Sequence, residues 1–330
     1  MMVKSDELLN ILADGRFHSG EALGAQMGIG RSAVWKHMRT LSRRGVEIHA
    51  VTGRGYRLAE PLELLDEGAL RQAMAPETRQ AVPVLEIHRQ TASTNQLLLE
   101  KAATGITSGH VCLAESQWAG RGRRGRAWYS PFARNLYCSM GWRFPDVPAS
   151  FPALGLAVGV GLVRALRSLG LADAQLKWPN DVLWRGRKLA GVLVEISGES
   201  HGPCSVVVGV GVNVRMPSSV PVAMARPWVD LTTALGADIS RNEACARVLD
   251  HLVDVLQVFQ REGFSPFVEE WRGLDALRGK MVTLEVSGWN HEGVSLGIDG
   301  QGALLIRHEN GVKRYMAGDV SLREGHGASG

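Results

Sequence analysis

The sequence predicts an α+β protein of several domains, with helices at the amino-terminal end, a mixed α/β centre and a small all-β carboxyl-terminal domain. Three observations predict it. Residues 1–62 combine helical periodicity with basic residues and end in a short ribbon-like stretch. Between residues 83 and 272, apolar strand-like runs alternate with helical stretches, which is typical of a mixed sheet covered by helices. After Gly279, short apolar segments separated by glycines indicate a small β-barrel.

The bulk composition fits a folded protein with more than one domain. A chain of 330 residues is long enough for two or three domains. Its 45% hydrophobic and 21% charged residues exclude a disordered chain, and a net charge of +4 permits a polyanionic partner without requiring one. We expect a DNA-binding type of domain over 1–62, a linker over 63–82, a catalytic domain over 83–272, a barrel over 273–324 and a flexible tail over 325–330.

Cysteine spacing and the apolar runs exclude several classes of protein. The four cysteines are far apart and form no C-x-x-C pair, so neither a zinc site nor a disulfide framework is expected, and each should be a buried small side chain. The amino-terminal residues lack the pattern of a secretory signal. The longest apolar run, 151–163, is shorter than the ~20 residues that span a bilayer. We therefore expect a cytoplasmic protein without a membrane partner.

The first 45 residues predict a helix-turn-helix. Ser19 can cap a helix over Glu21–Met27, and Gly28-Ile-Gly30 makes a tight turn into a second helix beginning at Arg31. On that second helix one face is apolar, formed by Val34, Met38 and Leu41. The opposite face carries the candidate DNA-binding side chains Ser32, Lys36, Arg39 and Arg43.

The next segment predicts a β-hairpin wing. Residues 46–58 alternate in polarity around a Gly-Arg-Gly tip, which would bring Arg54 and Arg57 to phosphate. The alternative is a protein-interaction module whose basic helix is simply solvated. The order of helix, turn, helix and wing favours DNA binding more than charge alone would.

A glycine-arginine run, Gly120-Arg-Gly-Arg-Arg-Gly-Arg126, carries the strongest chemical signal. Gly120, Gly122 and Gly125 match the dinucleotide fingerprint G-x-G-x-x-G, but Trp128-Tyr-Ser-Pro131 prevents the helix that a Rossmann turn needs. The run is therefore interpreted as a loop that brings backbone and guanidinium groups close to anions.

Arginine-rich loops suit a reaction that brings two anions together, such as attack of a carboxylate on an α-phosphate. At ~4 Å and an effective dielectric of ~20, each cation–anion pair contributes roughly 4 kcal/mol before desolvation. The alternative is a disordered arginine-glycine segment that binds RNA or targets the protein. The glycine-arginine run lies between two strand-like runs, which favours a loop within a folded domain over a disordered segment.

Two further motifs are candidates for a ligand site. Lys177-Trp-Pro-Asn-Asp181 contains a proline that fixes a bend, although a single lysine is more often a surface residue than a catalytic one. Residues 206–213 form an apolar strand with two glycines, which suits a flat ligand lying on the backbone or, alternatively, a simple bulge.

With these segments assembled, the sequence resembles the bifunctional biotin protein ligases and biotin operon repressors of bacteria over almost its whole length. The resemblance is carried, in order, by Ser93-Thr-Asn95, Gln117 with Ala119–Arg126, Lys177–Asp181, Lys188-Leu-Ala-Gly191 and Gly211-Val-Asn213. It implies a winged helix-turn-helix, a central mixed sheet with helices of the class II synthetase-like biotin/lipoate ligase fold, and an SH3-like barrel.

The resemblance also implies an activity and its partners. The chain would form biotinyl-5′-AMP from biotin and ATP, with Mg²⁺ accompanying the nucleotide, and transfer biotin to a lysine of a biotin carboxyl carrier domain of acetyl-CoA carboxylase. It would also repress biotin synthesis genes by binding operator DNA as a homodimer once the adenylate is bound. The alternatives are a ligand-sensing transcription factor without ligase turnover and a lipoate ligase of the same fold.

Site residues follow from the resemblance position by position. Lys188, Arg121 and Arg123 would be catalytic. The biotin site would comprise Ser93, Thr94, Asn95, Gln117, Gly120, Arg121, Gly122, Arg123 and Lys188. The nucleotide side would comprise Trp128, Lys177, Asn180, Asp181 and Asn213. Trp35 departs from the smaller polar residue usual on the family's recognition helix, which leaves the operator sequence open.

Overall fold

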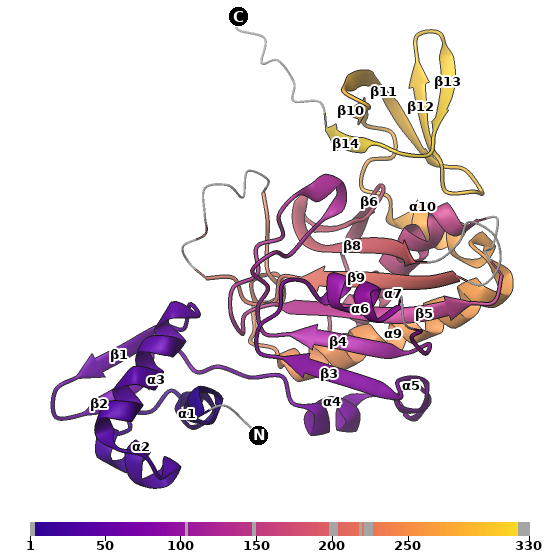
Figure 1. Ribbon diagram of the computed structural model, residues 1–330. Coiled ribbons are helices and arrows are strands. Elements are labelled where there is room, and N and C mark those ends of the chain that lie inside the picture. The colour runs from indigo at the N-terminus through magenta and orange to yellow at the C-terminus, as the bar shows by residue number, and fades with distance from the viewer. Residues whose placement is uncertain are drawn as a thin grey trace, which may run out of the picture.

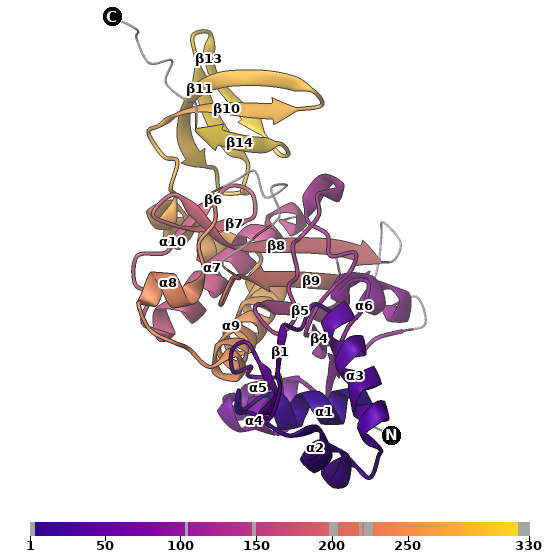
Figure 2. The same cartoon turned by 90° about the vertical axis from the view of Figure 1, so that its left-hand side faces the viewer.

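The computed structural model describes residues 4–102, 105–146, 150–197, 204–217, 220 and 227–322, so the expected tail at 325–330 lies outside the described residues. The described chain forms three parts. The helical amino-terminal domain and the carboxyl-terminal β domain lie at opposite ends of a central domain built on a large sheet (Figures 1 and 2). This arrangement confirms the predicted fold class.

The amino-terminal domain is a helix-turn-helix followed by a hairpin. Its elements are α1 Lys4–Leu12, α2 Gly20–Met27, α3 Arg31–Arg43, β1 Ile48–Val51 and β2 Gly55–Leu58. Ser19 caps α2 by accepting a hydrogen bond from the Ala22 N–H at 3.0 Å, and Gly28 ends it in the left-handed conformation with φ 63°. The apolar face predicted for the second helix is buried, as Val34, Met38 and Leu41 show.

A seven-stranded sheet forms the middle of the central domain, in the order β3-β4-β5-β9-β8-β7-β6. Only β3 and β4 pair in parallel; every other neighbouring pair is antiparallel. The strands are β3 Val84–His88, β4 His110–Ala114, β5 Leu136–Phe144, β6 Gln175–Lys177, β7 Asp181–Trp184, β8 Arg187–Ser197 and β9 Cys204–Val212.

Helices cover both faces of this sheet. The apolar helix α7 (Leu154–Ser168) packs with α9 (Arg241–Glu262) over one face, where the largest core cluster lies. The helix α6 (Thr94–Ala102) packs on the other face, with Leu98 against Cys112 and Val207 (Figure 1). The remaining helical segments are α8 Leu231–Leu235, α10 Val268–Leu274 and the short 3-10 turns Arg123–Gly125, Phe151–Ala153 and Ser265–Phe267.

The segment expected to be a linker, 63–82, differs from that expectation. It contains two short helices, α4 (Glu67–Ala73) and α5 (Pro76–Ala81). Leu70 and Val82 are fully buried in the core of the central domain. Two short helices with a single buried position per turn give little periodicity, which is why the sequence pattern did not reveal them.

The carboxyl-terminal domain is an antiparallel sheet of five strands in the order β13-β12-β11-β10-β14. Its strands are β10 Met281–Val286, β11 Trp289–Ile298, β12 Leu304–His308, β13 Gly311–Tyr315 and β14 Asp319–Leu322. A register shift between Ser295 and Gly297 bends β11. Because Val282, Leu284 and Val320 are fully buried and belong to the largest core cluster, this domain packs onto the central one.

One described helical stretch is long and apolar enough to be compared with a membrane span. It runs from Phe151 to Ser168, and 72% of it is buried inside the protein. Its contacts with α9 and the sheet identify it as a core helix. The four cysteines are free and buried, as predicted.

The amino-terminal and central domains meet at Phe132. This side chain and Ala133 belong to the same buried cluster as the helix-turn-helix core. Beside them lies an interdomain cavity of about 450 Å³ whose lining includes Arg44 and Leu58 from one domain and Gln117 and Ser130 from the other.

Candidate active site

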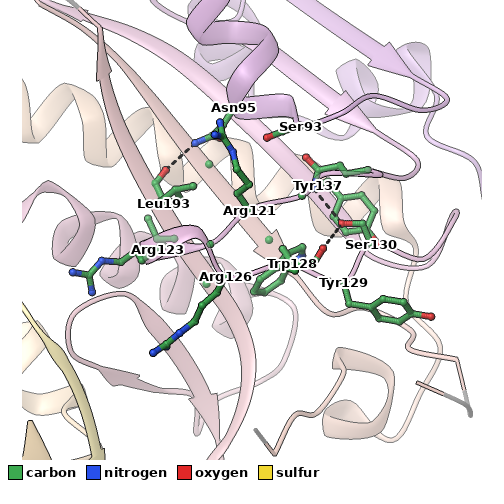
Figure 3. Close-up of a pocket in the computed structure, with 18 of the residues that line it drawn as sticks. Ser93, Asn95, Arg121, Arg123, Arg126, Trp128, Tyr129, Ser130, Tyr137 and Leu193 are labelled. Carbon is green, nitrogen blue, oxygen red and sulfur yellow. Dashed lines mark hydrogen bonds between the residues drawn. The ribbon is translucent and has the colours of Figure 1, made fainter. Parts of the chain in front are cut away.

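The main cavity of the central domain has a volume of about 790 Å³ and lies on the α6 side of the sheet. The start of α6, the 117–130 loop and strands β8 and β9 form its walls (Figure 3). It brings together every residue predicted for ligand binding except Lys177: Ser93, Thr94, Asn95, Gln117, Gly120, Arg121, Gly122, Arg123, Trp128, Asn180, Asp181, Lys188 and Asn213. Lys177 lies at the end of β6 and is not part of the lining.

One end of the cavity is a network of neutral polar groups. The Thr94 N–H donates to Gln117 Oε1 at 2.8 Å, and Gln117 Nε2 donates to Ser130 Oγ at 3.3 Å. Ser130 Oγ in turn donates to the Trp128 carbonyl at 3.0 Å. This network fixes the Gln117 side chain, so its remaining hydrogen-bonding capacity faces the cavity in a defined direction.

A second set of contacts holds Asn95. Ser139 Oγ lies 2.6 Å from Asn95 Oδ1, and Asn95 Nδ2 donates to Glu195 Oε2 at 2.8 Å. A Cβ on Gly209 would lie 2.2 Å from Asn95 Oδ1. Ser139 and Glu195 do not line the cavity but hold Asn95 in place, a role that the sequence did not reveal; a small hydroxyl in the apolar run of β5 was the available signal for Ser139.

Glycines form the floor under Trp128. A Cβ on Gly211 would lie 2.6 Å from the indole ring, and one on Gly191 would lie 3.3 Å from it. The Trp128 indole N–H is buried and has no hydrogen-bond partner among the described residues. A buried donor without a partner is costly, so this group is suited to an acceptor atom of a ligand.

The cationic end of the cavity contains Lys188 and Asp181. Lys188 Nζ lies 2.6 Å from Asp181 Oδ1, and it lies 5.2 Å from the centroid of the Trp128 ring. The two partners come from neighbouring strands, β8 and β7. This pairing places an ammonium group at a fixed point of the cavity beside a ring that can stack on a flat ligand.

The glycine-arginine run forms an ordered turn over the cavity. Gly122 N donates to the Arg126 carbonyl at 2.7 Å, and Trp128 N donates to the Gly120 carbonyl at 2.9 Å. No helix follows it before β5, which confirms that the dinucleotide fingerprint is coincidental. Arg123 is partly buried; this burial lowers the pKa of its guanidinium, while the nearby Asp319 carboxylate acts against that shift.

Asn180 and Asn213, both predicted for the nucleotide side, line the cavity and hydrogen-bond to the backbone. Asn180 Nδ2 donates to the Val192 carbonyl at 2.7 Å. Asn213 Nδ2 donates to the Val229 carbonyl at 3.1 Å and to the Lys188 carbonyl at 3.3 Å. Both amides therefore hold neighbouring strands and loops in place around Lys188.

The described residues offer no cluster of side chains that would hold a resident metal ion. Among the described residues, no three His, Cys, Asp or Glu side chains gather closely enough to hold a metal ion. Magnesium bound with a nucleotide needs only one or two protein carboxylates besides the phosphates. Asp181 and Asp319 both line the cavity, so the residues present fit magnesium delivered with ATP.

The predicted DNA-binding side chains lie on the exposed face of α3 and the wing. Ser32, Lys36, Arg39, Arg43 and Arg54 are all exposed. The Arg39 guanidinium carbon lies 4.9 Å from the Trp35 ring centroid, and that of Arg54 lies 4.3 Å from the Phe17 ring centroid. Aromatic rings therefore orient two of these arginines before any partner binds.

Known proteins share this architecture. Three family profiles match: a helix-turn-helix domain at 4–57, the biotin/lipoate A/B protein ligase family at 87–213 and the biotin protein ligase C terminal domain at 278–323. The Bifunctional ligase/repressor BirA of Salmonella typhimurium is 40% identical over 96% of both chains. That of Escherichia coli is 39% identical over 96% of both chains. The chain belongs to this ligase/repressor family.

A solved structure has a similar fold over most of the chain. The biotin protein ligase from Aquifex aeolicus, in complex with biotin and ATP, superposes with a TM-score of 0.64 at 29% identity. The match covers 73% of this chain and 99% of that protein.

Proposed function

We propose that this chain is a biotin protein ligase that also acts as a biotin-responsive repressor. One observation supports the ligase most strongly: a single cavity joins a neutral hydrogen-bonding end at Thr94 and Gln117 to a cationic end at Lys188, and Arg121 and Arg123 of the loop also line it. Biotin has matching ends, a ureido ring and a carboxylate. The relatives described above add support, because each full-length relative is a bifunctional ligase/repressor.

In the proposed first step, a carboxylate oxygen of biotin attacks the α-phosphorus of ATP and pyrophosphate leaves. Arg121, Arg123 and Lys188 stabilise the two anions that approach and the charge that develops between them. The Trp128 ring lines the same cavity and can stack on the nucleotide. Asp181 and Asp319 would hold magnesium bound to the triphosphate, which would supply additional positive charge to the leaving group.

In the second step, the amine of a carrier lysine attacks the acyl carbon of biotinyl-5′-AMP. AMP leaves with the bonding electrons and the amine loses its proton as the amide forms. The loop over residues 120–127 excludes water until the carrier arrives, which protects the mixed anhydride from hydrolysis.

The ligase proposal is tested by pyrophosphate release from the purified full-length chain. Release should require biotin, ATP and magnesium together, and a carrier domain should gain the mass of one biotinyl group. Release that ignores biotin would reject the proposal. Pyrophosphate release with lipoate in place of biotin would favour the lipoate ligase. Binding of biotin without formation of an adenylate would favour a ligand-sensing transcription factor without turnover.

Neutralising the three cationic side chains tests the chemistry more directly. Arg121→Gln, Arg123→Gln and Lys188→Met combined should lower biotin attachment by at least ~100-fold, because donors to developing charge are lost. Arg79→Gln on α5, an exposed arginine outside the cavity, is the matched control and should leave the rate unchanged. Unimpaired attachment in the triple variant would contradict the mechanism.

The repressor half rests on the exposed cations of α3 and the wing. We propose that the chain forms a homodimer when the adenylate is bound and that this dimer binds operator DNA. The side chains that contact the DNA would be Ser32, Lys36, Arg39, Arg43 and Arg54. Sedimentation with and without biotin and ATP tests this; a monomer under both conditions would refute it. The free, buried cysteines are consistent with the proposed cytoplasmic location.

We also propose the domain limits 1–62, 83–272 and 273–324. The matched family profiles fall inside these limits. The segment between the first two carries α4 and α5 and packs with the central domain.

A further inference from the structure

The four arginines of the glycine-arginine loop point in two directions. The Arg121 guanidinium lies beside Asn95, and its Nη2 is 3.9 Å from Glu195 Oε1 (Figure 3). Arg123 and Arg126 point away from Asn95 (Figure 3). The loop therefore directs Arg121 toward Asn95 and Glu195 and directs Arg123 and Arg126 elsewhere.

Arg124 reaches the carboxyl-terminal domain. Its Nη1 donates to Glu285 Oε1 at 3.0 Å, and its Nη2 donates to the Glu285 carbonyl at 3.3 Å. Arg124 also has a φ of 56°, a left-handed conformation that costs energy for a residue with a side chain. The two-point contact with Glu285, on β10, offsets that cost and fixes the tip of the loop.

Arg126 and Arg123 meet the same domain at the start of β14. Arg126 Nη2 forms an ion pair with Asp319 Oδ2, and the Asp319 side chain is only 14% exposed. Arg123 Nη1 donates to the Gly318 carbonyl at 3.3 Å. Gly318 and Asp319 themselves line the main cavity, so the carboxyl-terminal domain forms part of its wall.

We propose that Glu285 and Asp319 form a clasp through which the carboxyl-terminal domain holds the arginine loop over the cavity, with Arg124 and Arg126 as positioning residues. The idea rests on the proposed ligase function, because what the loop covers is then an acyl adenylate. An exposed ion pair alone contributes little. Here Arg123, Arg124 and Arg126 all contact the carboxyl-terminal domain, and one of the two carboxylates is largely shielded from water.

The clasp makes two measurable claims. Without any ligand, it should limit how often the loop opens. With biotin and ATP bound, it should slow escape of the adenylate, because the loop must leave its place before the intermediate can diffuse away. The first claim does not depend on catalysis.

Limited trypsin digestion of the ligand-free full chain tests the first claim. Glu285→Gln combined with Asp319→Asn should speed cleavage after Arg123, Arg124 and Arg126 by about tenfold, read by mass spectrometry, because cleavage follows the open population. Glu269→Gln is the matched control: it removes a carboxylate that pairs with Arg272 on α10, away from the loop. It should leave loop cleavage unchanged.

A charge exchange separates the contact from a general loss of folding. Arg126→Asp alone should increase cleavage after Arg124, and adding Asp319→Arg should restore protection by rebuilding the ion pair in reverse. If the double variant stays as sensitive to trypsin as Arg126→Asp while its thermal midpoint is unchanged, the Arg126–Asp319 contact is not what protects the loop.

Adenylate retention tests the second claim. The Glu285→Gln/Asp319→Asn protein should release radiolabelled biotinyl-5′-AMP at least several-fold faster than the unmodified protein on a filter, with a smaller change in the rate of its formation. Equal cleavage and equal release would overturn the clasp. If the unmodified protein makes no adenylate, the proposed ligase fails, while the trypsin result still decides whether the clasp holds the loop.

Discussion

At the scale of single residues, Gly211 shows how closely the backbone approaches the Trp128 ring, which we propose contacts the nucleotide. A Cβ added there would lie 2.6 Å from Trp128, so Gly211→Ala must displace the indole. We expect the KM for ATP to rise about tenfold, because a stacking surface is worth roughly 1–3 kcal/mol. Gly300→Ala, where a Cβ meets no atom within 4 Å, is the control and should leave the KM unchanged. An unchanged KM in Gly211→Ala would show that Trp128 does not contact the nucleotide.

Most of the cavity residues could be identified from the sequence because each lies in a short run of distinctive composition. Gln117, Trp128 and Lys188 flank or lie within such runs. Glu195 and Asp319 could not be identified in this way. Glu195 reaches Asn95 across 100 positions of sequence, and Asp319 comes from another domain, so their roles depend on long-range packing that no local pattern encodes.

At the scale of elements, the helix α3 was predictable because its apolar face repeats at the helical period over about two turns. Val34, Met38 and Leu41 are all buried as that period requires. The helices α4 and α5 were not predicted, although each carries a boundary signal. Asp66 caps α4 by accepting from the Ala69 N–H at 2.8 Å, and Pro76 is the first residue of α5. Such signals are weak without periodicity to support them.

The exposed face of α3 leads to a prediction about DNA. Lys36→Ala and Arg39→Ala should weaken operator binding and reduce the dependence of log K on log salt by about one unit each, because each removes one phosphate contact. Ligase turnover should stay near that of the unmodified chain. Arg79→Ala is the control for loss of one positive charge. A parallel loss of turnover would mean that this helix serves the catalytic domain instead.

The edge strand β3 is tied to α6 and β4 through Glu86. Burial acts to raise the pKa of Glu86, but hydrogen bonds from Lys101, His110 and His88 outweigh it, and the pKa falls to about 2. Because the folded-state pKa lies below the ordinary value of 4.5, the stabilisation is complete above that value and is lost as the pH falls toward 2.

Replacing this carboxyl group tests that linkage. In Glu86→Gln, the free energy of unfolding should change less steeply between about pH 5 and pH 3 than in the unmodified chain, as measured by urea denaturation. Glu67→Gln, which removes an exposed carboxylate paired with Arg71, should leave the slope nearly unchanged. A slope unaffected by Glu86→Gln would show that this group carries no pH-dependent stability.

At the scale of the whole molecule, the amino-terminal domain depends on a side chain from the central domain. Phe132 is 6% exposed and lies in the cluster that forms the helix-turn-helix core. Phe132→Ala should destabilise that domain by about 3 kcal/mol, the usual cost of truncating a buried phenylalanine. Calorimetry should then resolve an earlier transition for residues 4–58, with the central domain unfolding as before. A single transition at the original temperature would contradict this dependence.

The same junction has a consequence for genetics. Gln117 and Ser130 border both the main cavity and the smaller cavity against the helix-turn-helix. A substitution at either position alters two surfaces simultaneously. A mutant screen that scores only growth without added vitamin would merge defects of attachment with defects of gene control, so alleles at these two codons need both phenotypes measured separately.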